Sequence, residues 1–270
     1  MQSLFRNSRR KLSQGMVFWR EVGAGTPVIF LHGAWYDSSQ WVGVMESLGR
    51  SCHCFAPDLL GCGESDIPEI HYSINLEAEF LAEFLDALKL ERVYLVGDSI
   101  GAWIAASYAL KYPQQVAGLV LISPEGVEID NFDRYCKKMQ SLAKRPEWIL
   151  ELLKFLRPLT KMFGWDGKVE QDLQQQRLLL QNPTSTELLY LRQLPEIKAE
   201  LLQNQLSLLT IPTLVIQAGK DSPESLSRSN LYASLIPQAQ MKTIAHGGNN
   251  LPGNCANVVA TDIKDLLFGG

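Results

Sequence analysis

A serine stands in the pentapeptide Gly97-Asp98-Ser99-Ile100-Gly101, directly after the apolar run Val93–Val96 and before a helical segment. Serine is a poor nucleophile at its ordinary pKa and needs an adjacent base, which itself needs an orienting acid. A sharp strand-to-helix turn would hold Ser99 in a strained backbone conformation, and Gly97 and Gly101 keep its neighbours small enough to avoid clashes. The pentapeptide therefore predicts a nucleophilic serine.

The base that this serine needs must be one of four histidines, which are His32, His53, His71 and His246. We expect His246 to be the base, because it follows the last predicted strand in an accessible loop from which an imidazole could reach a nucleophile. His53 lies inside a predicted buried strand, and His71 lies on an exposed loop before a helix. His32 stands at a strand end beside Gly33, where we expect it to hydrogen-bond to the loop backbone.

An acidic residue would orient the imidazole and stabilise its charged form. Asp221 is the first choice, because Gly219-Lys220-Asp221 directly follows the predicted strand at Thr213–Ala218. Glu125 is the alternative, because it comes just after another predicted strand, in Ser123-Pro124-Glu125-Gly126. The sequence leaves both carboxylates open.

Backbone N–H groups must also face the oxyanion of a tetrahedral intermediate. One donor is expected to be the N–H of Ile100, at the start of the helix that follows the serine. The second should come from the loop after Val28–Leu31, where Gly33 permits a sharp turn and the N–H of Ala34 is the preferred donor. Trp35 is the alternative donor in that loop.

Short apolar runs that alternate with helical segments would position these residues. Most of the runs are typical of strands buried on both faces. They are Met16–Trp19, Val28–Leu31, Cys52–Ala56, Val93–Val96, Leu119–Ile122, Thr213–Ile216 and the weaker Gln240–Ile244. Residues 75–88 place leucine and phenylalanine at helical spacing, and 102–110 form a small, apolar helix. This alternation predicts an α/β fold with a mostly parallel sheet.

The stretch 126–209 breaks the alternation, because it contains no convincing strand. It is rich in Leu, Lys, Gln and Glu, and its helical periodicity is interrupted by prolines. We expect about four or five short helices there, because a structureless loop of that length is uncommon. The sequence thus predicts a core domain of residues 1–125 and 210–270, with a helical cap inserted at 126–209.

Composition excludes several classes of protein. A formal net charge of −4 with 20% charged residues provides no basic surface for nucleic acid. No apolar run approaches the roughly 18 residues that span a bilayer, and no apolar segment follows Arg9-Arg10-Lys11 to complete a signal peptide. The cysteines show neither metal-site nor redox spacing; they are Cys52, Cys54, Cys62, Cys136 and Cys255. We expect a cytoplasmic protein with reduced thiols, no metal and no cofactor, and with a small molecule as its partner.

The whole pattern resembles the α/β-hydrolase superfamily, from about residue 16 to residue 268. The order Ser99, Asp221, His246 is the order of that superfamily. His32-Gly33 and the segment Asp58–Ser65, which is similar to a D-x-x-G-x-G-x-S turn, add to the resemblance. The superfamily's helical cap also falls where the strandless insertion falls. The resemblance implies an eight-stranded, mostly parallel sheet flanked by helices, and a Ser-His-Asp triad.

Three positions depart from the superfamily pattern. Gly219-Lys220-Asp221 is one residue shorter than the usual G-x-x-D, which keeps Glu125 in consideration as the acid. Asn250 stands where a glutamate is common, four residues after the histidine. Asp98 precedes the nucleophile in place of the more familiar His, Asn or Trp, either as a solvated or helix-capping acid or as a group that tunes the pocket.

The resemblance implies hydrolysis of a carboxylic (acyl) ester through an acyl-enzyme. Ser99 argues against haloalkane dehalogenases and epoxide hydrolases, which use aspartate at this position. The alternatives are a C–C bond hydrolase, a perhydrolase or a hydroxynitrile lyase with the same triad, or a ligand sensor with slow turnover. Oligomeric state is left open.

The predicted cap gives the one indication of the substrate. It holds bulky apolar side chains that either pack its helices together or line a pocket for an apolar part of the ester; they are Trp148, Phe155, Met162, Phe163 and Trp165. A basic group at its start is expected to be a solvated face, with anionic lipid or a substrate carboxylate as alternative partners; it comprises Lys137, Lys138, Lys144 and Arg145.

Overall fold

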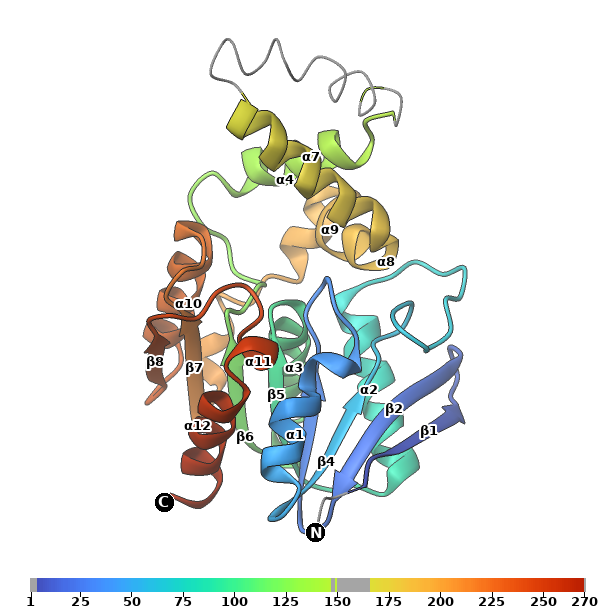
Figure 1. Cartoon of the computed structure of the whole chain (residues 1–270), viewed down its shortest axis with the longest axis vertical. Coiled ribbons are helices and arrows are strands. Elements are labelled where there is room, and N and C mark those ends of the chain that lie inside the picture. Colours follow the sequence, from blue (N-terminus) through green and yellow to red (C-terminus); the bar gives the residue numbers. More distant parts are fainter. Residues whose placement is uncertain (1–3, 147–148, 150–165, 270) are drawn as a thin grey trace. The chain divides into compact units, whose positions relative to one another are not determined.

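The computed structural model describes residues 4–146, 149 and 166–269. The chain divides into two compact units. The first comprises Met1–Ile129 and Glu200–Gly270, and the second comprises Asp130–Ala199. Each unit is described separately below (Figure 1).

The first unit is built on an eight-stranded sheet with the order β1-β2-β4-β3-β5-β6-β7-β8. Its strands are β1 Arg6–Lys11, β2 Met16–Gly23, β3 Thr26–Leu31, β4 Cys52–Pro57, β5 Val93–Asp98, β6 Val116–Ile122, β7 Thr213–Ala218 and β8 Gln240–Ile244. The pairs β1–β2 and β2–β4 are antiparallel, and every other pair is parallel. The predicted α/β fold with a mostly parallel sheet is confirmed.

Helices cover both faces of this sheet. They are α1 Val42–Leu48, α2 Ile74–Leu88, α3 Ile100–Lys111, α10 Pro223–Leu235, α11 Leu251–Asn254 and α12 Ala256–Phe268, with short 3-10 turns η1 Ser38–Trp41, η2 Pro113–Gln115 and η4 Leu206–Leu208. In Figure 1, α1 and α12 lie side by side in front of the strands, and α3 lies behind β5. The packing of helices on the sheet removes apolar surface from water, and each Å² of apolar surface removed stabilises the fold by roughly 25 cal/mol.

The strands at the centre of the sheet have apolar side chains on both faces. Phe30 of β3, Val96 of β5 and Ile216 of β7 belong to one buried cluster with side chains of α1 and α12. The intervening residues, such as Leu95 and Leu121, are also fully buried and face the other layer of helices. Burial on both faces explains why these strands appear in the sequence as continuous apolar runs.

The strand β1 was not predicted, because its sequence Arg-Asn-Ser-Arg-Arg-Lys contains no apolar residue. Five of its six residues are exposed, so it obtains its order from pairing along β2 rather than from burial. Side chains reinforce that pairing: Arg6 forms an ion pair with Glu21, and the Arg9 guanidinium lies over the Phe18 ring.

The second unit is helical throughout its described residues. Its elements are α4 Phe132–Ala143, α7 Asp166–Gln181, α8 Pro183–Thr186, the π-helical turn η3 Glu187–Leu191 and α9 Leu194–Ala199. The predicted apolar side chains of the cap, expected either to pack its helices together or to line a substrate pocket, lie outside the described residues; they are Trp148, Phe155, Met162, Phe163 and Trp165.

Two segments of the predicted insertion, 126–129 and 200–209, belong to the first unit. The Leu202 N–H donates to the Gly126 carbonyl at 2.8 Å, which pairs the two segments. The Glu200 carboxylate accepts hydrogen bonds from the Ile74 and Asn75 N–H groups, and so caps the first turn of α2. Among the described residues, no helix has the length and apolar character needed to cross a membrane.

Candidate active site

Ser99 connects β5 to α3 in a strained backbone conformation, with φ 52° and ψ −112°. This conformation is costly for a residue with a side chain, and such outliers gather at functional sites. Two glycines make the turn possible. A Cβ on Gly97 would lie 2.4 Å from the carbonyl carbon of Gly101, and a Cβ on Gly101 would lie 2.3 Å from the Leu31 carbonyl oxygen. The turn therefore requires glycine at both positions.

The backbone of Ser99 is held, but its hydroxyl is not engaged. The Ser99 N–H donates to the Ile122 carbonyl at 2.9 Å, and the Glu125 N–H donates to the Ser99 carbonyl at 3.3 Å. Ser99 is the N-cap residue of α3, yet its side chain makes no capping hydrogen bond. Its Oγ has no hydrogen-bond partner within the described part of the chain, and the residue is partly exposed. The hydroxyl is thus available to react.

The expected oxyanion donors lie at two neighbouring backbone turns. Ile100 begins α3, where the first N–H groups of a helix have no partner within the helix. The loop after β3 contains Ala34, and it lies beside the serine turn because Gly101 packs against the carbonyls of Leu31 and His32. The N–H groups of Ala34, Trp35 and Ile100 donate to no other described residue. All three remain candidates.

Asp221 and His246 lie on adjoining loops after β7 and β8. The Lys220 N–H donates to the Gly247 carbonyl at 2.9 Å, which joins the two loops one residue away from each candidate. Asp221 accepts from the Ser225 hydroxyl at 2.6 Å and from the Ser222 N–H at 3.0 Å. His246 is exposed and bonds to no other described residue. The structure brings the two loops together without a hydrogen bond between Asp221 and His246.

Glu125 lies beside Ser99 in the backbone but is engaged elsewhere. Its carboxylate forms an ion pair of 2.7 Å with Arg228 of α10, and its carbonyl accepts from the Tyr232 hydroxyl at 2.6 Å. Burial raises the pKa of Glu125, and the Arg228 charge opposes that shift. The carboxylate already has a cationic partner, which makes it the less available of the two candidate acids.

His32 is fully buried at the end of β3. Its Nδ1 lies 2.9 Å from the Gly33 carbonyl, and its Nε2 accepts from the Leu59 N–H at 3.0 Å. These two bonds require a neutral ring with the proton on Nδ1, which agrees with a pKa lowered by burial. His32 therefore connects the loop after β3 to the loop after β4.

The loop after β4 contains the Asp58–Ser65 turn. Asp58 accepts from the Ser38 N–H through one carboxylate oxygen and from the Glu64 N–H through the other, each at 2.7 Å. The Ser65 hydroxyl donates to the Asp58 carbonyl at 2.9 Å. The turn fixes the chain entering η1, and its polar side chains are occupied by that role.

Sequence reasoning missed Gln40, which lies in η1 and is buried. Its side-chain amide donates to Asp98 at 2.9 Å and to Asn250 at 3.1 Å, and accepts from the Gly33 N–H at 2.9 Å. A single glutamine before a tryptophan belongs to no motif, so nothing in the local pattern indicated these contacts.

Asp98 is buried directly before Ser99. Burial raises its pKa to about 7, the hydrogen bond from Gln40 opposes that shift, and the Asp221 charge adds to it. Gly33 packs so closely on this carboxyl that a Cβ at position 33 would lie 2.6 Å from Asp98 Oδ2. Asp98 is therefore neither a solvated acid nor a cap of α3.

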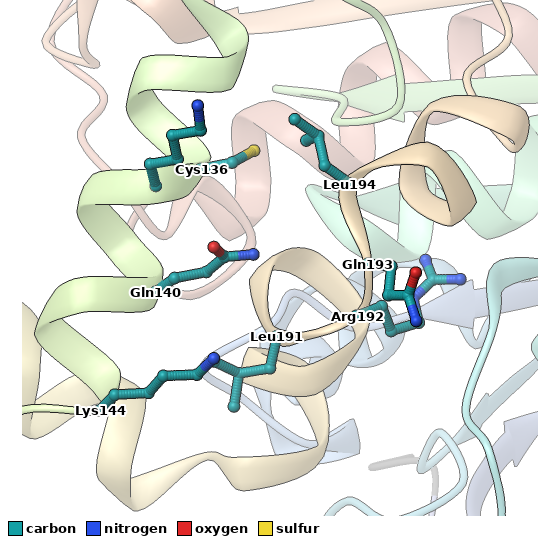
Figure 2. A pocket seen from close by; sticks show the side chains of 8 residues that line it. Cys136, Gln140, Lys144, Leu191, Arg192, Gln193 and Leu194 are labelled. Atoms are coloured by element: carbon teal, nitrogen blue, oxygen red, sulfur yellow. The ribbon is translucent and has the colours of Figure 1, made fainter.

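The second unit contains a pocket of about 330 Å³. Figure 2 shows its two walls, with α4 on one side and the segment 191–194 on the other. Its lining residues are Cys136, Lys137, Gln140, Lys144, Leu191, Arg192, Gln193 and Leu194. Two members of the predicted basic group, Lys137 and Lys144, thus line a pocket, whereas Lys138 pairs with Asp172 at 3.0 Å. Within the described residues, no cluster of three or more His, Cys, Asp or Glu side chains could hold a metal ion.

The chain was compared with known protein families, proteins and structures. A family model described as the alpha/beta hydrolase fold matches residues 26–252. The chain is 39% identical over 117 residues to a 2-hydroxy-6-oxo-2,4-heptadienoate hydrolase of Pseudomonas putida, over 42% of each protein. It is 29% identical over 148 residues to a haloalkane dehalogenase of Agrobacterium fabrum, over 54% of this chain and 49% of that one.

Among solved structures, the fold is similar to that of a putative lipase from Acinetobacter baumannii. The TM-score is 0.76 at 21% sequence identity, with 98% of this chain and 91% of that chain covered. The two curated relatives are matched over less than half of their own length. The family match covers most of the sequence, including the serine turn, and on that basis this chain belongs to the α/β-hydrolase family.

Proposed function

We propose that the protein hydrolyses carboxylic esters, with Ser99 as nucleophile, His246 as general base and Asp221 as orienting acid. The observation that carries this proposal is the backbone of Ser99, which is strained, follows a buried strand, begins a helix and leaves its hydroxyl without a partner among the described residues. A structural serine gains nothing from such a position. A nucleophile gains exposure and proximity to the helix N-terminus.

The reaction would proceed in two halves. In the first, Ser99 Oγ attacks the ester carbonyl as His246 takes its proton, and the N–H groups of Ala34 and Ile100 stabilise the oxyanion. The intermediate collapses to an acyl-enzyme, and His246 returns the proton to the departing alcohol. In the second half, His246 deprotonates a water that attacks the acyl carbon, which releases the acid and restores Ser99.

Two observations support the roles of His246 and Asp221. The Lys220–Gly247 hydrogen bond holds their loops against each other, and an exposed His246 can change rotamer without breaking a hydrogen bond to another described residue. Asp221 accepts three hydrogen bonds, from Gln217, Ser222 and Ser225, and a carboxylate has about four lone-pair sites, so it retains capacity for an imidazole N–H. Catalytic hydrogen bonds are often closed only when substrate is bound.

The test is hydrolysis of p-nitrophenyl esters from acetate to octanoate by the wild type and by Ser99→Ala. We expect the substitution to lower kcat by a factor on the order of 10³ or more. Ser123→Ala is the matched control, because Ser123 also ends a central strand with a positive φ, of 41°. It should keep wild-type turnover. Equal turnover by Ser99→Ala and the wild type would refute the serine mechanism.

A second candidate reaction is C–C bond hydrolysis, which is favoured by the similarity to the Pseudomonas putida hydrolase. The same nucleophile would act on a ketone carbonyl instead of an ester. Turnover of 2-hydroxy-6-oxo-2,4-heptadienoate, without turnover of the ester series, would favour this reaction. In either case, activity must disappear in Ser99→Ala.

A further inference from the structure

The side-chain amide of Gln40 uses every hydrogen atom it has. Gln40 is 6% exposed, and its Nε2 donates one hydrogen to Asp98 Oδ2 and the other to Asn250 Oδ1. Its Oε1 accepts from the Gly33 N–H. The reverse orientation of the amide would point NH₂ at an N–H and oxygen at a carboxyl, so the surrounding groups permit only one orientation.

The three partners of Gln40 belong to three separate parts of the proposed site. Gly33 immediately precedes Ala34 on the loop that supplies an oxyanion donor. Asp98 immediately precedes Ser99. Asn250 lies four residues after His246 and also caps α11, because its Oδ1 accepts from the Gly253 N–H at 3.0 Å. One buried amide therefore joins segments that are 58 and 210 residues away from it in sequence.

We propose that Gln40 is a positioning residue, which fixes the oxyanion loop, the nucleophile turn and the base loop relative to one another. This inference rests on the proposed serine-hydrolase function. It also accounts for two of the departures from the superfamily pattern, because Asp98 and Asn250 are the two acceptors of the Gln40 amide.

The charges around Asp98 agree with this role. The Asp98 carboxyl bonds to Gln40 and to no other described residue, while Asp221 and Tyr36 are the titratable groups that interact with it. Because the bond from Gln40 lowers the pKa of Asp98, its loss should raise that pKa further. Any part of the activity profile that follows Asp98 ionisation should then move to higher pH.

Small displacements at a catalytic site have large effects on rate. A misplacement of about 1 Å can lower the rate by about 10²-fold, even when the substitution is outside the reacting groups. Gln40 touches none of the proposed reacting atoms, so its loss should lower kcat far more than it raises KM. If Gln40 had only a structural role, its replacement would lower stability without lowering kcat more than it raises KM.

The experiment compares Gln40→Met with Val44→Ala in the ester assay. Methionine matches the length of glutamine but makes no such hydrogen bonds, and Val44 is a fully buried core residue of α1. Both variants should unfold at lower urea concentration. We expect only Gln40→Met to lose kcat, by about 10- to 100-fold with KM nearly unchanged, and to shift the pH profile upwards. Wild-type kcat in a folded Gln40→Met would overturn the proposal.

A second pair of variants decides the matter if Gln40→Met does not fold. Asn250→Ala and Ser73→Ala each remove a helix N-cap, but only Asn250 also contacts Gln40. The positioning role predicts a lower kcat for Asn250→Ala alone, and equal kcat in the two variants would overturn it. Ser99→Ala is measured in parallel, because turnover that survives in this variant refutes the proposed function. Turnover that requires Ser99 but is unchanged in the Gln40 and Asn250 variants refutes only this inference.

Discussion

Glu77 offers a prediction that depends on the fold alone. It lies in the first half of α2 and is 1% exposed. One carboxyl oxygen accepts from the Leu60 N–H at 3.3 Å, and the other has no hydrogen-bond partner in the part of the chain that the structure describes. Burial raises the pKa of this carboxyl from 4.5 to about 8, and the bond from Leu60 only partly opposes that shift. Glu77 is therefore mostly protonated at neutral pH.

The sign of the effect on stability follows from which state binds the proton more tightly. Since folding raises the pKa of Glu77, its contribution to stability is complete below pH 4.5 and is lost as the pH rises towards 8. Where the folded state binds one proton more than the unfolded state, each rise of one pH unit lowers the free energy of unfolding by about 1.4 kcal/mol. Between pH 5 and pH 8 the loss amounts to about 3 to 4 kcal/mol of unfolding free energy.

Glu77→Gln should remove this loss, because glutamine has a similar shape, can still accept from Leu60 and does not ionise. Urea unfolding at pH 5 and pH 8 measures it: the wild type should lose about 3 to 4 kcal/mol more than the variant over that interval. Glu79→Gln is the control, because the ion pair with Lys111 lowers the pKa of Glu79, which then titrates below pH 5. The same pH dependence in wild type and Glu77→Gln would refute the reasoning.

Two further substitutions test the candidate site through stability. Asp98→Asn should reduce the stability lost between pH 5 and pH 8 by about 2 to 3 kcal/mol, since burial raises the pKa of this carboxyl to about 7. Identical urea midpoints for this variant and the wild type at both pH values would contradict it. Gly101→Ala should lower unfolding free energy by about 2 kcal/mol or more and abolish labelling by a fluorophosphonate, because its Cβ would lie 2.3 Å from the Leu31 carbonyl oxygen. Normal stability in this variant would show that the serine turn tolerates a side chain.

The parts of the fold that were predicted are those in which local sequence and burial agree. Central strands are buried on both faces, so runs such as Val28–Leu31 and Val93–Val96 indicate them directly. The strand β1 follows no such rule, because its order comes from the neighbouring β2 and not from its own apolar content. Tertiary context decides edge strands of this kind.

The site was predictable to the extent that it depends on local turns. Gly97 and Gly101 indicate a serine turn because the backbone leaves no room for a Cβ, and the structure has the strained φ that this requires. Gln40 could not be found in that way, because its three partners come from distant segments and only the folded sheet brings them together. The roles of His246 and Asp221 stay predictions.

The arginine-rich strand β1 also affects how the protein meets other proteins. It forms one edge of the sheet, where backbone N–H and C=O groups are open to pairing with a strand of another molecule. Arg10 and Lys11 place positive charge on this edge, and Arg6 and Arg9 lie there in ion pairs with Glu21 and Glu64. A second copy that approached edge to edge would bring the same cations against them, so repulsion disfavours the continuous intermolecular sheet from which aggregates grow.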